Sequence, residues 1–128
     1  MEKLSKKILI VEDDQDLQNL LADRLGSTNY TVFKASDGEE AISMVLDNRP
    51  DLILLDLLLP KLDGFHVLER LRHYPDPEVA SIKVIVLSNL WSDKDILRAQ
   101  ALKIDEYYVK ANTNLDEVYS KIAQILAR

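Results

Sequence analysis

Acidic side chains follow two strongly apolar segments of this 128-residue chain. Asp56 closes the apolar segment 51–56, and Glu12-Asp13-Asp14 comes directly after the run 8–11. Continuous runs of Leu, Ile and Val are typical of buried parallel strands. Open sheets of such strands bind ligands at the carboxyl ends of the strands. We therefore expect the carboxylates of Glu12, Asp13 and Asp56 to meet at one edge of a sheet.

Carboxylates gathered in one crevice repel one another and raise one another's pKa unless a cation neutralises them. Mg²⁺ suits such a site, because it binds a few carboxylates, keeps water and leaves positions for phosphate oxygens. The carboxylate of Asp56 can then attack phosphorus, as carboxylates do when an aspartyl phosphate forms. The residues thus predict a Mg²⁺ site at Glu12, Asp13 and Asp56, with Asp56 as nucleophile.

A hydroxyl and an ammonium group follow two further apolar segments. Ser88 comes after the segment 82–87, and Lys110 comes after the segment 106–109. We expect Lys110 to pair with Asp56 at rest and with a phosphoryl oxygen afterwards, while Ser88 donates to another phosphoryl oxygen. Catalysis would then consist mainly of charge neutralisation and positioning. Taken singly, Ser88 would more simply cap a turn and Lys110 would be a solvated surface charge.

Strand-like segments alternate with segments of helical periodicity along the whole chain. The expected strands are Lys7–Val11, Thr31–Ala35, Asp51–Asp56, Ile82–Leu87 and Glu106–Val109. The expected helices begin near Asp14, Asp37, Asp63, Ser92 and Asn114; the first stops at Gly26, and the third breaks at Pro75 and Pro77. This alternation predicts an α/β fold with helices on both faces of a parallel sheet. We expect a doubly wound, flavodoxin-like sheet of five strands in the order 2-1-3-4-5.

Length and composition predict one globular domain over residues 1–128, with its core at about residues 7–127. The apolar runs are too short for a membrane span, and Met1–Lys7 has no apolar segment typical of a secretion signal. The chain contains no cysteine, which excludes disulfides and suits a cytoplasmic location. A net charge of −6 argues against direct binding of nucleic acid. The chain ends directly after the fifth expected helix, so we expect no output domain within it.

These residues together resemble the receiver domain of two-component response regulators, of the single-domain chemotaxis type. The resemblance covers essentially the whole chain. It rests on the segments 8–14, 56–64, 84–88 and 105–110 taken together, because any one of them alone would be a weak signal.

The resemblance assigns a role to each residue of the expected site. It implies that Asp56 accepts a phosphoryl group from the phosphohistidine of a sensor histidine kinase or a phosphotransfer protein. The backbone carbonyl of Leu58 would join Glu12 and Asp13 as a ligand of Mg²⁺. Ser88 would be the switch hydroxyl and Tyr107 the aromatic residue that rotates with it.

The resemblance also implies a signalling phosphoacceptor rather than an enzyme, with intrinsic autophosphorylation and autodephosphorylation chemistry. Phosphorylation would alter the face built by the fourth helix, the fifth strand and the fifth helix. A downstream protein, or a second phosphorylated copy in a homodimer, would bind this face.

Some positions depart from the family pattern. Ala111 stands where proline commonly follows the lysine, so we expect no cis peptide there. Asn89 stands where a small residue commonly follows the switch hydroxyl. Leu58 and Leu90, two residues after Asp56 and Ser88, are apolar and cannot position an attacking water. They predict slow autodephosphorylation.

Other functions remain as alternatives on the same architecture. A pseudo-receiver would serve only as an interaction module, but the presence of all the chemical residues argues against it. A haloacid-dehalogenase-type phosphatase needs a second acid where this chain has Leu58. A dinucleotide enzyme needs a glycine-rich first turn, and Gly26, Gly38 and Gly64 are not so placed. A flavodoxin would need a phosphate-cradling loop where Glu12-Asp13-Asp14 stands.

Overall fold

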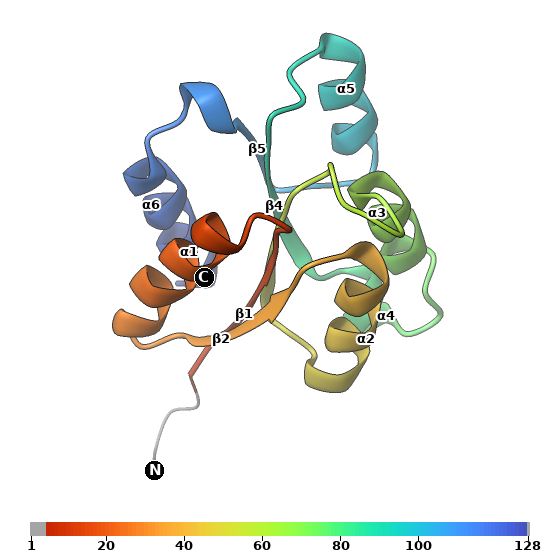
Figure 1. The fold of residues 1–128 in the computed structure, drawn as a ribbon. Helices are drawn as coiled ribbons and strands as arrows, with labels where there is room; N and C mark the ends of the chain where they lie inside the picture. Colours follow the sequence, from red (N-terminus) through yellow and green to blue (C-terminus); the bar gives the residue numbers. More distant parts are fainter. Residues whose placement is uncertain (1–4, 128) are drawn as a thin grey trace.

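A single parallel sheet, with strands in the order β2-β1-β3-β4-β5, forms the middle layer of the computed structural model, which describes residues 5–127 (Figure 1). The strands are β1 (Lys7–Val11), β2 (Thr31–Ala35), β3 (Leu52–Leu55), β4 (Lys83–Ser88) and β5 (Glu106–Val109). The helices are α1 (Gln15–Ser27), α2 (Gly38–Asn48), α3 (Gly64–Arg72), α4 (Pro77–Ala80), α5 (Asp93–Ala101) and α6 (Leu115–Leu126). The predicted fold class and strand order are confirmed.

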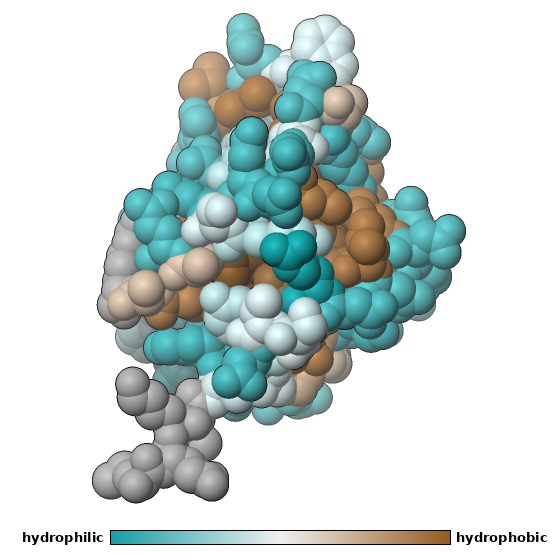
Figure 2. Space-filling model, turned by 90° about the vertical axis from the view of Figure 1, so that its left-hand side faces the viewer, coloured by the Kyte–Doolittle hydropathy of each residue, from teal (hydrophilic) through white to brown (hydrophobic). Residues whose placement is uncertain are grey.

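Helices cover both faces of the sheet, which explains why the inner strands β1, β3 and β4 are buried and apolar along most of their length. Leu9 and Val11 of β1 pack toward the face covered by α2, α3, α4 and α5. Ile8 and Ile10 of the same strand pack toward α1 and α6 on the opposite face. The outer side of α1 and α6 is mostly hydrophilic, with smaller hydrophobic patches between the polar side chains (Figure 2).

Helix starts agree closely with the capping residues seen in the sequence. Ser92 and Asn114 cap α5 and α6, and the side chain of each accepts a hydrogen bond from a backbone N–H of the first turn. Asp14 caps α1, since its Oδ1 accepts from the N–H groups of Asp16 and Leu17. Asp14 therefore has the capping role that the sequence favoured over metal binding.

One predicted helix end was wrong, and one short helix was not predicted. Helix α1 continues through Gly26 to Ser27, and the chain reverses at Asn29, which adopts the left-handed conformation at φ 78°. Pro77 does not only break the chain after α3: it begins the short helix α4, because a proline fits the first helical turn, where no N–H partner is needed.

None of the helices in residues 5–127 combines the length and the apolar character needed to cross a bilayer. The prediction about a secretion signal in Met1–Lys7 falls partly on residues 1–4, which lie outside the described residues together with residue 128.

Candidate functional site

The acidic residues leave the sheet from two adjacent strands. Strands β1 and β3 are parallel neighbours, with Val11 opposite Leu55. The N–H of Asp56 donates to the carbonyl of Val11 at 3.0 Å, which extends the ladder by one step. Glu12 and Asp56 therefore emerge side by side at the carboxyl ends of the strands, where the strand order reverses.

The three predicted acids do come together. One carboxylate oxygen from each of Glu12, Asp13 and Asp56 lies within 4.8 Å of those of the other two. Glu12 and Asp56 are buried, whereas Asp13 is exposed. Burial raises the pKa of Glu12 above its ordinary value, against the hydrogen bonds from Lys110 and from the backbone of Asp14. Hard oxygen donors at this separation fit Mg²⁺, which prefers carboxylate ligands and water.

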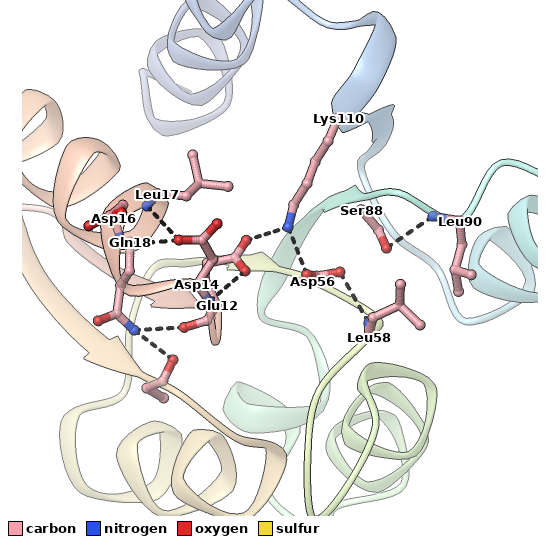
Figure 3. Close-up of polar contacts among 11 residues, drawn as sticks. Glu12, Asp14, Asp16, Leu17, Gln18, Asp56, Leu58, Ser88, Leu90 and Lys110 are labelled. Carbon is pink, nitrogen blue, oxygen red and sulfur yellow. Dashed lines mark hydrogen bonds and ion pairs between the residues drawn. The ribbon is translucent and has the colours of Figure 1, made fainter.

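Lys110 reaches into this cluster from the end of β5 (Figure 3). Its Nζ donates to Asp56 Oδ2 at 2.8 Å and lies 2.7 Å from Glu12 Oε1. Burial alone would lower the pKa of Lys110, but the hydrogen bonds to Asp56 and Glu12 outweigh it and raise that pKa. The lysine therefore stays charged and bridges the two buried carboxylates. The sequence indicated its pairing with Asp56 but not with Glu12.

The second carboxylate oxygen of Asp56 is fixed by the turn that follows β3. Asp56 Oδ1 accepts a hydrogen bond from the N–H of Leu58 at 3.1 Å (Figure 3). The turn then passes under Gly64, where an added Cβ would lie only 2.5 Å from the Asp56 carbonyl oxygen. Only glycine allows this approach, so Gly64 holds the start of α3 against the residue that carries the central carboxylate.

Ser88 and Tyr107 are joined through one peptide segment. Ser88 is buried at the end of β4, and its Oγ accepts from the N–H of Leu90 at 3.4 Å. The hydroxyl of Tyr107 donates to the carbonyl of the same Leu90 at 2.7 Å. Tyr107 packs against the core on the face of the sheet that α2, α3 and α5 cover, whereas Tyr108 packs on the opposite face. The link through Leu90 was not visible in the sequence, because it uses main-chain atoms.

The chain after Lys110 forms a 3-10 turn over Lys110–Asn112. Within residues 5–127 no peptide bond is cis, and Thr113 Oγ1 donates to the Val109 carbonyl at 2.6 Å. This turn leads into α6 without the proline that is common in the family pattern.

Replacing Tyr107 by Phe is expected to lower the free energy of unfolding by about 1 kcal/mol, because the Leu90 carbonyl loses its donor. Burial raises the pKa of the Tyr107 hydroxyl from 10.0 to about 12. A pKa that is higher in the folded chain favours the neutral form, so this contribution is lost as pH rises from about 10 to about 12. Urea unfolding across this pH range should show a steeper loss for the wild type than for Tyr107→Phe. Tyr108→Phe is the matched control, and equal behaviour of all three chains would contradict the prediction.

Gln18 is one further buried polar residue close to the acids, and it was not predicted. The sequence does indicate its burial, because Gln18 precedes Leu21 and Leu25 by one and two helical turns, on the apolar face of α1. A polar residue in such a position is buried and therefore needs hydrogen-bond partners.

The fold and this site define a doubly wound α/β protein with a lysine-bridged acidic centre at the switch point of its sheet. Comparison with known families gives the class more closely. The response regulator receiver domain family matches residues 8–123, and the chain belongs to this family.

Several curated relatives are described as transcriptional regulators. The chain is 36% identical over 128 residues to the probable transcriptional regulator ycf27 of Cyanophora paradoxa, covering 100% of this chain and 51% of the relative. It is 35% identical over 125 residues to the alkaline phosphatase synthesis transcriptional regulatory protein PhoP of Bacillus subtilis, covering 98% of this chain and 50% of the relative. The chain thus spans about half the length of the curated relatives it matches.

Solved structures agree with this assignment. A two-component response regulator from Clostridium difficile superimposes with a TM-score of 0.87 at 30% identity, covering 97% of this chain and 98% of that one. The receiver fold is therefore shared along almost the whole chain.

Proposed function

We propose that this chain is a phosphoacceptor receiver domain, in which Asp56 accepts a phosphoryl group from a histidine kinase or a phosphotransfer protein in a Mg²⁺-dependent reaction. The observation that carries the proposal is the position of Lys110, whose ammonium group bridges Asp56 and Glu12 inside the acidic cluster. Membership of the receiver family supports it.

The transfer step needs little more than a placed carboxylate. A carboxylate oxygen of Asp56 attacks the phosphorus of phosphohistidine, a P–O bond forms, and the N–P bond breaks. The imidazole nitrogen keeps the electron pair and takes up a proton from solvent. Mg²⁺, held by Glu12, Asp13, Asp56 and the Leu58 carbonyl, would neutralise charge on the phosphoryl oxygens.

Lys110 acts before and after the transfer. Its contact with Asp56 Oδ2 keeps the carboxylate oriented, and its contact with Glu12 Oε1 holds the ammonium group in place. Once Asp56 is phosphorylated, the ammonium group is free to bind a phosphoryl oxygen while Glu12 still anchors it. Such a charge-assisted contact stabilises the phosphorylated state.

The switch runs from Ser88 to Tyr107. Ser88 Oγ accepts a long hydrogen bond from the N–H of Leu90, and a movement of Ser88 toward a phosphoryl oxygen would pull on this contact. A shift of Leu90 then disturbs the hydrogen bond from the Tyr107 hydroxyl to the Leu90 carbonyl. The surface altered in this way lies on α5, β5 and α6, which are the fourth helix, fifth strand and fifth helix of the sequence prediction. Phosphorylation would thus favour one of two arrangements of the surface formed by α5, β5 and α6.

The remaining parts of the proposal follow from this signalling role. Residues 1–128 form one receiver domain with its core at about residues 7–127, and the chain works in the cytoplasm. The altered face binds a downstream protein or a second phosphorylated copy. Because the relatives named as transcriptional regulators are about twice as long, any action on DNA belongs to other parts of such proteins. The receiver itself carries a net charge of −6.

The test of this function is phosphoryl uptake. Incubation with acetyl phosphate and Mg²⁺ should give an acid-stable, hydroxylamine-sensitive acyl phosphate, mapped to Asp56 by mass spectrometry of borohydride-reduced peptides. Chelation of Mg²⁺ should suppress the uptake. A chain that binds no Mg²⁺ and takes up no phosphoryl group would instead be a pseudo-receiver, acting through protein contacts alone.

The acyl phosphate is expected to decay slowly, over many minutes rather than seconds, in Mg²⁺ buffer without a phosphatase. Leu58 is 51% exposed beside Asp56, and its apolar side chain cannot orient a water molecule for attack on phosphorus. Leu58→Gln should speed the decay severalfold, while Leu20→Gln, an equally exposed leucine on α1, should leave it unchanged. A half-life of seconds in the wild type would contradict the prediction.

A further inference from the structure

Buried polar side chains are few in residues 5–127: Glu12, Gln18, Asp56 and Ser88. Three of them belong to the proposed phosphorylation site, and Gln18, which is 3% exposed, has no part in the chemistry described above. Removing an amide from water is unfavourable unless hydrogen bonds replace the lost hydration. The partners of Gln18 therefore indicate what the residue does.

The amide nitrogen of Gln18 binds two main-chain carbonyls. Its Nε2 donates to the Glu12 carbonyl at 2.9 Å (Figure 3). It also donates to the Ala35 carbonyl at 3.0 Å, with a longer contact of 3.4 Å to Ser36 Oγ. Both carbonyl oxygens are acceptors only, so the nitrogen of the amide must face them. The two N–H groups of Gln18 thus tie the end of β1 to the end of β2.

This tie fixes the main chain of Glu12 on both sides. The Glu12 N–H donates to the Ala35 carbonyl at 3.0 Å, and the Glu12 carbonyl accepts from Gln18. Both peptide groups that flank the Glu12 Cα are therefore held, and with them the direction in which the Glu12 carboxylate leaves the chain. Asp13 follows immediately, so its position depends on the same anchor.

We propose that Gln18 is a positioning residue for the metal-binding acids: by clamping the Glu12 and Ala35 carbonyls together, it holds Glu12 and Asp13 in the geometry that receives Mg²⁺. This inference rests on the proposed function. Gln18 acts through the main chain and does not itself touch the metal. Groups that orient ligands in this way typically change metal affinity ten- to a hundredfold when removed.

The variant Gln18→Met keeps the length and approximate volume of the side chain and removes both N–H donors. Gln15→Met is the matched control on the same helix, because Gln15 Nε2 donates to Ser36 Oγ at 3.0 Å. Mg²⁺ binding is measured by calorimetry, and the rate of labelling by acetyl phosphate is measured as a function of Mg²⁺ concentration. Thermal unfolding in EDTA reports the stability of each variant.

We expect Gln18→Met to raise the half-saturating Mg²⁺ concentration about tenfold or more, with a maximal labelling rate close to that of the wild type. Gln15→Met should change neither quantity. A Gln18→Met chain that loses stability but keeps the half-saturating Mg²⁺ concentration of Gln15→Met would overturn the proposal, since Gln18 would then only stabilise the core.

A second variant guards against failure of Gln18→Met to fold. Gln18→Asn keeps an amide but is one CH₂ shorter, so it cannot reach both carbonyls, and it should also raise the half-saturating Mg²⁺ concentration. An unchanged value would overturn the proposal as well. A wild-type chain that binds no Mg²⁺ and takes up no phosphoryl group would mean that the proposed function itself has failed. If the wild type binds Mg²⁺ and takes up a phosphoryl group, and the Gln18 variants keep its half-saturating Mg²⁺ concentration, only the role proposed for Gln18 has failed.

Discussion

Asp56→Asn should reduce labelling by acetyl phosphate or by a cognate kinase to background. The amide is a poor nucleophile toward phosphorus and carries no negative charge, although it has nearly the shape of the carboxylate. In the folded chain this substitution removes the anion that pairs with Lys110 Nζ at 2.8 Å and leaves the surrounding packing in place. Acid-gel autoradiography or intact-mass measurement gives the extent of labelling.

The control for this experiment is Asp51→Asn. Asp51 is an exposed acid just before β3, at the opposite edge of the sheet, where its Oδ2 accepts from the Lys7 N–H at 2.8 Å. This variant should be labelled like the wild type. Circular dichroism should show both variants folded, so that loss of label reports the chemistry. Undiminished labelling of Asp56→Asn would remove Asp56 from its proposed role.

Lys110→Met should lower the free energy of unfolding by about 3 kcal/mol or more at neutral pH in EDTA, because it leaves two buried carboxylates without their cation. The side chains of Glu12 and Asp56 are only 3% and 4% exposed, so water screens their repulsion poorly. Urea denaturation measures the loss. Saturating Mg²⁺ should restore part of it, since a ligand that binds only the folded chain stabilises it.

Lys121→Met is the matched control for Lys110→Met. Lys121 Nζ lies 3.7 Å from Glu106 Oε2, and the Glu106 side chain is 40% exposed, so this pair is worth less than about 1 kcal/mol. Equal losses in the two variants would show that the bridge formed by Lys110 contributes no special stability. A Lys110→Met chain that gains no stability from Mg²⁺ would contradict the assignment of the acids to metal binding.

The sequence was most informative where a local rule decides the structure. A strand covered on both faces is apolar along most of its length, and β1 was predicted on this basis with its correct bounds. The bounds of the half-buried edge strands β2 and β5 were also predicted correctly. Ser92 and Asn114 predicted the starts of α5 and α6, because a side-chain oxygen at the N-cap accepts a hydrogen bond from a free N–H of the first turn. The alternation of elements predicted a parallel sheet, and the strand order expected of a flavodoxin-like sheet then predicted the meeting of Glu12 and Asp56.

Contacts between distant segments could not be predicted in the same way. The hydrogen bonds of Leu90 use only its backbone, so no residue type signals them. The contact of Lys110 with Glu12 depends on the reach of a flexible side chain across the sheet. Gln18 lay in a pattern of apolar residues, but its partners at Glu12 and Ala35 became visible only once β1 and β2 were side by side.

The backbone of Leu90 and the side chain of Leu90 have different roles in the proposed site. Its N–H and C=O groups connect Ser88 to Tyr107, whereas its side chain takes no part in these two hydrogen bonds. Any amino acid other than proline supplies the same two backbone groups. If the proposed function holds, we expect that exchanging the side chain at position 90 can change the lifetime of the aspartyl phosphate while the backbone contacts to Ser88 and Tyr107 stay in place.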